Sequence, residues 1–116
     1  MEQIYNKSVR DNIPNIIENN GEEPIIRVLS NKEYKLELER KLNEEYLEVL
    51  ESSGKDRLEE LADMLEVIKS LSQLENSNLN EIIAIAEEKS KKRGGFEKRI
   101  YLEKVISKNK SIKWLT

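Results

Sequence analysis

The chain has 116 residues, the length of one domain, and hydrophobic and charged residues each make up 37% of it. Its net charge of −3, from 20 basic and 23 acidic residues, argues against nucleic acid as a partner. The absence of Cys and His excludes disulfides, thiolate chemistry and an imidazole ligand or base, so any chemistry must use carboxylates, Lys and Arg.

The N-terminus, "MEQIYNKSVRDNIP", has no apolar signal core, and no run of residues approaches the roughly 18 apolar residues that a membrane span requires. We therefore expect a single domain over residues 1–116 that is soluble, cytoplasmic and without a membrane partner. Because apolar residues are scarce, we also expect partner chains to complete the burial of the core, as in a homo-oligomer.

The few Pro and Gly residues divide the first part of the chain into two segments. Residues 9–19 carry apolar side chains at helical spacing, with Pro14 near the first turn and Gly21 just past the end, which predicts a short helix. "EPIIRVLS" follows and is too brief and too rich in β-branched residues for another helix. Residues 24–29 are therefore expected to be extended, in a short strand at most.

Two long helices come next. Ser30 and Glu33 form a capping-box pattern ahead of an apolar-periodic run over about residues 31–51, which "SSGK" ends. A second run over about residues 56–74 has apolar positions around more than half of its circumference. This pattern is typical of a central helix that packs on several sides.

A fourth helix is expected through "LNEIIAIAEEKSKKR", with Asn78 as its cap and Gly94 and Gly95 as its stop. Residues 99–106 fit either a short extended strand or a last helix. The sequence thus predicts an all-α protein, a bundle of four to five helices with antiparallel core helices.

The second predicted helix carries a carboxylate inside its apolar face. At about 100° per residue, Glu45 falls among apolar side chains of that face. These are Leu38, Leu42 and Val49. Glu48 lies one turn further along, at the edge of the same face, close enough to share a ligand with Glu45.

The third predicted helix repeats this arrangement. Glu60 lies in line with Met64, Val67 and Leu71, and Asp63 lies at the edge of their stripe. A short loop joins the two helices, so they are expected to be antiparallel and to bring their acids together. The converging set is Glu45, Glu48, Glu60 and Asp63.

Four converging carboxylates need neutralisation, because an unpartnered buried carboxylate costs several kcal/mol. Lys41 is the only basic residue that clearly shares the face of the second helix, so salt bridges account poorly for all four acids. A divalent cation fits better, and Mg²⁺, or Mn²⁺, bound in this way keeps waters for phosphate oxygens. The competing interpretation is that these acids are solvated surface residues, which is the commoner case for a single Glu at the edge of a stripe.

The pair "EEYLE" and "EELAD" resembles the E-E-x-x-E and E-E-x-x-D metal motifs of the all-α nucleoside triphosphate pyrophosphohydrolases, the superfamily of MazG, the all-α dUTPases and phosphoribosyl-ATP pyrophosphatase. The opening "YNKSVRDNIPNIIENNG" and the close "KKRGGFEKRIYLEKV" are most similar to small MazG-like proteins, so the resemblance spans about residues 5–105. It implies Mg²⁺-dependent hydrolysis of an NTP or dNTP to the monophosphate and pyrophosphate. The acids that match the metal ligands are Glu45, Glu48, Glu60 and Asp63.

The resemblance implies further roles. Glu44 matches an acid that in some relatives is proposed to activate the water, although its wheel position is off the apolar arc. The candidate phosphate contacts are Lys7, Arg10, Lys89, Lys92 and Arg93. The last three also suit the C-terminal end of a helix without any ligand, since they offset its dipole. Glu87 and Ser90 stand where the family motif has an Asn and an aromatic residue.

Two other functions stay open as alternatives. One is phosphoribosyl-ATP pyrophosphatase of histidine synthesis, which shares the acids and differs in substrate. The other is a non-catalytic helical oligomer or adaptor whose acids serve a structural ion or solubility. The resemblance also implies a homo-oligomer, a dimer or a tetramer with the core helices at the interface.

Overall fold

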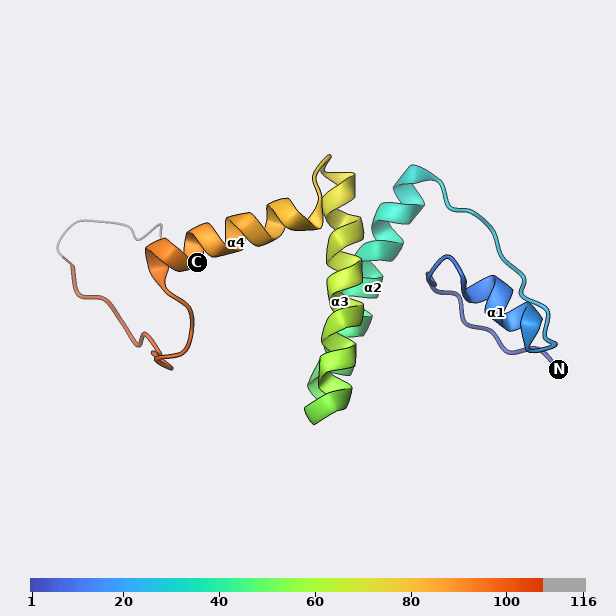
Figure 1. Ribbon diagram of the computed structural model, residues 1–116, viewed down its shortest axis with the longest axis horizontal. Helices are drawn as coiled ribbons and strands as arrows, with labels where there is room; N and C mark the ends of the chain where they lie inside the picture. The colour runs from blue at the N-terminus through green and yellow to red at the C-terminus, as the bar shows by residue number, and fades with distance from the viewer. Residues whose placement is uncertain (108–116) are drawn as a thin grey trace.

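The computed structural model describes residues 1–107, in which helices are the only regular secondary structure and there is no strand. The helices are α1 (Ile13–Asn19), α2 (Asn31–Glu51), α3 (Gly54–Leu74) and α4 (Leu79–Arg93). α2 and α3 form an antiparallel hairpin, α4 leads away from the end of α3, and α1 lies on the opposite side of the hairpin (Figure 1). The predicted all-α class is confirmed. Among the described residues, none of the helices combines the length and apolar character needed to cross a membrane.

The caps explain why α2 and α4 have the predicted bounds. The backbone N–H of Glu33 donates to Ser30 Oγ at 3.3 Å, and the backbone N–H of Ser30 donates to the Glu33 carboxylate at 3.5 Å, which completes the capping box. At α4, the backbone N–H of Glu81 donates to the Asn78 side chain at 2.9 Å. These bonds form between residues three apart, so the sequence pattern is enough to locate them.

Two predictions, for the start of the first helix and for residues 99–106, need correction. α1 begins at Ile13 because Pro14 has no N–H to donate and fits only the first turn of a helix. Residues 99–106 form neither the strand nor the helix predicted for them. Residues 24–29 are not helical, as predicted, and they form no strand because no described segment pairs with them to make a ladder. Residues 108–116 of the predicted domain lie outside the described part.

The core is confined to the seam between α2 and α3. Leu38 and Val67 are the only buried apolar side chains among the described residues, and Glu45 is buried beside them with 5% of its surface exposed. The other predicted core positions are half-buried: Leu42, Val49, Met64 and Leu71. The helical wheel therefore placed the acid correctly within an apolar seam.

The outer faces of the helices leave apolar side chains in water. Leu58, Leu61 and Leu65 of α3 are 66%, 44% and 45% exposed, and their spacing of three and four residues is that of a coiled-coil seam. α4 has no buried residue. The chain exposes 11147 Å², against about 6,600 Å² for a compact monomer of this size. The expected packing of α3 on several sides is thus not achieved within a single chain.

Candidate functional site

Three carboxylates meet on one flank of the hairpin. Glu45 of α2, and Glu60 and Asp63 of α3, each bring one carboxylate oxygen to within 4.8 Å of the others. Oxygens around Mg²⁺ at its usual ligand distance are separated by about 3 to 4 Å, so small side-chain movements would close this set around an ion. We call these three residues the acid cluster.

Glu48, the fourth predicted ligand, borders the acid cluster without belonging to the three-carboxylate group. It lies near two members of the cluster, because its carboxyl group contributes to the raised pKa values of Glu45 and Glu60. The structure thus brings together three of the four predicted ligands and places the fourth against them.

Two oxygens of the acid cluster have no partner. Glu45 Oε2 and Glu60 Oε2 are buried and make no hydrogen bond among the described residues. Burial raises the pKa of Glu45 to about 7, and the hydrogen bond and negative charge of Glu48 add to this rise. The pKa of Glu60 is raised mainly by its hydrogen bond to Glu48, and also by burial. Buried unpartnered carboxylate oxygens are costly, and as hard donors they suit Mg²⁺ or Mn²⁺.

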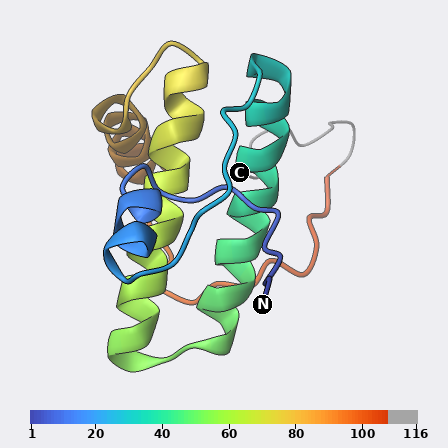
Figure 2. The same ribbon diagram turned by 90° about the vertical axis from the view of Figure 1, so that its right-hand side faces the viewer.

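Two cations already offset part of the cluster's charge. Arg10 Nη2 lies 2.7 Å from Asp63 Oδ1, and Lys41 Nζ lies 3.4 Å from Glu45 Oε1. Lys41 was visible on the helical wheel, but Arg10 arrives on the N-terminal segment, which crosses in front of the hairpin (Figure 2). Internal ion pairs therefore take a larger share of the neutralisation than the sequence indicated. They leave Glu60 without a basic partner among residues 1–107.

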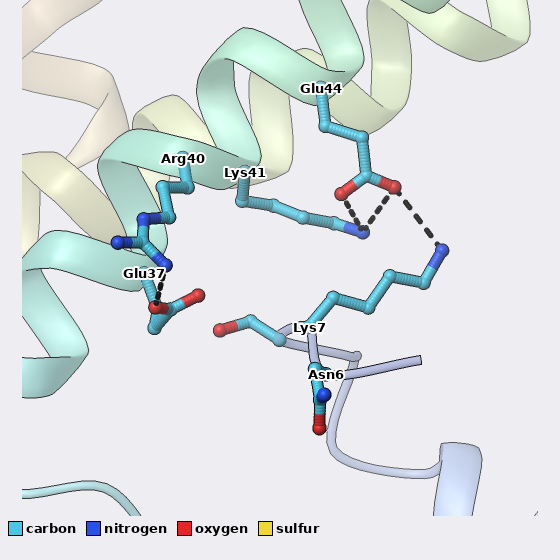
Figure 3. Close-up of a pocket in the computed structure, with 7 residues that line it drawn as sticks. Asn6, Lys7, Glu37, Arg40, Lys41 and Glu44 are labelled. Carbon is cyan, nitrogen blue, oxygen red and sulfur yellow. Dashed lines mark hydrogen bonds and ion pairs between the residues drawn. The ribbon is translucent and has the colours of Figure 1, made fainter. Parts of the chain in front are cut away.

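A pocket of about 170 Å³ lies between the N-terminal segment and the first half of α2 (Figure 3). Lys41 lines this pocket and also pairs with Glu45 of the acid cluster. Within the pocket, the Glu44 carboxylate forms ion pairs with Lys7 Nζ at 3.2 Å and with Lys41 Nζ at 3.4 Å. Burial raises the pKa of Glu44, but the hydrogen bonds and charges of the two lysines outweigh burial and leave the pKa below its ordinary value. The residue predicted to activate a water is therefore ionised and holds two cations in place.

A second pocket, of about 380 Å³, lies on the other side of the cluster, toward the turn between α2 and α3. Five acidic side chains line it together with Ser52: Glu48, Glu51, Asp56, Glu59 and Glu60. This lining favours cations and repels an uncomplexed phosphate chain.

The predicted phosphate contacts on α4 do not reach the acids within one chain. Lys89, Lys92 and Arg93 are exposed on a helix that leads away from the hairpin (Figure 1), and Lys92 pairs with Glu88 at 3.6 Å. Of the five predicted substrate-binding residues, the structure places Lys7 and Arg10 at the acids. Lys41 is the site residue that the motif comparison missed, and its place on the apolar face was the signal that could have identified it.

The raised pKa of Glu45 predicts an unusual pH dependence of stability in EDTA. The folded protein holds a proton on Glu45 up to about pH 7, whereas the ordinary pKa of a Glu side chain is 4.5. The proton therefore binds the folded state more tightly than the unfolded state. This contribution to the free energy of unfolding is complete below pH 4.5 and is lost as pH rises through 7. We expect the free energy of unfolding to fall by up to about 3 kcal/mol between pH 5 and pH 8. Urea denaturation at several pH values measures this fall.

The matched variant for this experiment is Glu45→Gln. It should flatten most of the profile and be the more stable protein at pH 8, because Gln has no charge to bury. The chain has no His to titrate in the same range. A wild-type profile that is flat, or that rises with pH, would contradict the burial of this carboxylate.

Comparisons with family models, with curated proteins and with solved structures found no match to this chain. They identify no family, so the assignment to MazG-like enzymes stays a prediction, and the functional interpretation depends on the geometry of the acid cluster.

Proposed function

We propose that the protein is a metal-dependent nucleoside triphosphate pyrophosphohydrolase, which cleaves an NTP or dNTP to the monophosphate and pyrophosphate. The observation that carries the proposal is the buried Glu45, with an unpartnered oxygen, facing Glu60 and Asp63 from the opposite helix. Three carboxylates in this arrangement are a donor set for a hard divalent cation. The resemblance of both acidic motifs to those of the pyrophosphohydrolases supplies the reaction.

In this proposal Glu45, Glu60 and Asp63 hold Mg²⁺, or Mn²⁺, with Glu48 beside them. The bound ion would polarise phosphate oxygens and lower the pKa of a bound water. Glu44 is ionised, as a proton acceptor must be, but both of its oxygens are engaged by ammonium groups. Lys7 and Lys41 must therefore move away from Glu44 before it can accept a proton.

The direct test is pyrophosphate release from a panel of ribo- and deoxyribonucleoside triphosphates with and without Mg²⁺. We expect equal amounts of monophosphate and pyrophosphate, and no product in EDTA. Phosphoribosyl-ATP belongs in the same panel, because cleavage of that compound alone would favour the enzyme of histidine synthesis. A failure to cleave any member would favour the non-catalytic alternative.

Metal binding should also raise the thermal stability of the folded protein. An ion at 100 times its Kd contributes about 2.7 kcal/mol, which corresponds to a shift of several degrees in Tm for a domain of this size. Differential scanning fluorimetry with a Mg²⁺ series measures the shift, and Asp63→Asn should reduce it. A wild-type Tm that does not change at millimolar Mg²⁺, or an undiminished shift in the variant, would count against the acid cluster as the metal site.

We further propose that the active form is a homo-oligomer and that a second copy of the chain covers the outer face of α3. The coiled-coil spacing of Leu58, Leu61 and Leu65 and the large exposed area of the single chain support this occupant. At about 100° per residue, Asp63 lies to one side of Glu60, while Leu61 and Leu65 lie about 100° to 140° to the other. A second copy can therefore dock without covering the acids.

A further inference from the structure

The two cations at the acid cluster bind the same carboxylates that a metal ion would take. Arg10 pairs with Asp63 at 2.7 Å, and Lys41 pairs with Glu45 at 3.4 Å. Both acids belong to the three-carboxylate group. A divalent cation at this group would compete with the guanidinium and the ammonium for these oxygens, and both side chains would then need new partners.

The pocket beside the cluster would gain positive charge in that exchange. Lys7 and Lys41 already share the single carboxylate of Glu44, and the guanidinium of Arg40 is neutralised by Glu37 at 3.0 Å (Figure 3). If Lys41 loses its contact to Glu45, only the Glu44 carboxylate remains to offset the two ammonium groups of Lys7 and Lys41. This part of the pocket then has one excess positive charge. Arg10, released from Asp63, adds a second.

The same pocket has an unused hydrogen-bond donor. Ser8 lines it, and the buried Ser8 Oγ makes no hydrogen bond among the described residues. A hydroxyl group beside ammonium and guanidinium groups is a donor set for phosphate oxygens, because charge-assisted hydrogen bonds to such oxygens are short and strong. Lys7, Ser8 and Arg10 lie on a segment without regular secondary structure, so they can move without breaking a helix.

We propose that this pocket binds a phosphate group of a polyphosphate chain, and that Arg10 and Lys41 exchange partners, from the cluster's carboxylates to phosphate oxygens, when a divalent cation binds. The choice of a polyphosphate ligand rests on the proposed function. The exchange makes the two ligands mutually dependent: the cation frees the groups that hold the phosphate, and the phosphate holds those groups away from the cation's carboxylates.

The test uses two binding measurements on Arg10→Gln and Lys41→Gln. The first is the affinity for Mn²⁺ alone, measured by the paramagnetic resonance of free Mn²⁺. The second is the affinity for imidodiphosphate, a non-hydrolysable diphosphate, measured by calorimetry at saturating Mg²⁺. We expect each variant to bind Mn²⁺ about threefold or more tightly than the wild type and imidodiphosphate about tenfold or more weakly, since one competitor and one phosphate donor are lost together.

Lys35→Gln is the matched control, because Lys35 is exposed on α2, lines neither pocket and forms no ion pair in the described structure. Both of its affinities should stay within about twofold of the wild type, as screened long-range charge effects are small. Arg10→Lys, which keeps the charge, should retain imidodiphosphate binding and serves if Arg10→Gln does not fold. Unchanged affinities in the test variants, or a weakening of both ligands together, would overturn the partner exchange.

Neither measurement requires turnover, so the two proposals can fail separately. If the variants bind Mn²⁺ more tightly and imidodiphosphate more weakly, but the protein hydrolyses no nucleotide, the partner exchange stands and the proposed function is wrong. If the protein hydrolyses nucleotides but the two affinities do not shift in opposite directions, the proposed function stands and the partner exchange is wrong.

Discussion

Replacing Glu60 with Gln should reduce Mg²⁺-dependent hydrolysis on the order of 100-fold or more, since even residues that only support metal ligands are worth 10- to 100-fold. Glu60 Oε2 is buried without a partner, and no basic residue of the described chain offsets its charge. The side chain therefore lies among carboxylates, with Glu45 and Asp63 in the acid cluster and Glu48 beside it, and it forms no ion pair in the described structure. The measurement is kcat/KM for pyrophosphate release at saturating Mg²⁺.

The same variant should keep its fold. Glu48 and burial both raise the pKa of Glu60, so the charged form is unfavourable in the metal-free protein and neutral Gln removes that cost. Its Tm in EDTA should equal or exceed the wild-type value. Glu39→Gln, at an exposed position on α2, removes one acid that lines neither pocket and forms no ion pair in the described structure, and it should leave both activity and Tm unchanged. Wild-type turnover in Glu60→Gln would falsify the metal assignment.

Replacing Leu61 and Leu65 together with Lys should dissociate the proposed homo-oligomer and destabilise the protein by several kcal/mol. The single chain buries only two apolar side chains in its described part, which is too small a core to offset the conformational entropy of a domain. In the proposed homo-oligomer the outer leucines supply the missing burial, and two ammonium groups would prevent it. Light scattering after gel filtration gives the mass, and urea denaturation gives the free energy of unfolding.

The control for that variant is Gln73→Lys, which adds a positive charge at another exposed position of α3. It should retain the wild-type mass and stability. If the double variant does not fold, the single Leu65→Lys should show a weaker, concentration-dependent association. A wild-type protein that is monomeric at 13.6 kDa and stable at all concentrations would contradict the interface.

Local structure in this protein could be predicted well from its sequence. The bounds of α2 and α4 follow from caps between residues three apart, Ser30 with Glu33 and Asn78 with Glu81. The position of Glu45 inside an apolar seam follows from the helical repeat alone. Only short-range hydrogen bonds and one periodicity are involved, and both are written in consecutive residues.

The features that the sequence could not predict depend on contacts between distant residues. The ion pair between Arg10 and Asp63 joins residues 53 positions apart, and it exists because a segment without regular structure crosses the hairpin. The direction of α4, which leads Arg93 away from the acids within one chain, likewise depends on its packing against α3, and no residue of α4 is buried.

The sequence therefore predicts the long helices and the inward position of Glu45, because hydrogen bonding and the helical repeat act over one or two turns. The identity of the cations that meet the acids emerged from the three-dimensional structure alone. The path of an irregular segment depends on the sum of many weak long-range contacts, and no short pattern of residues encodes that sum.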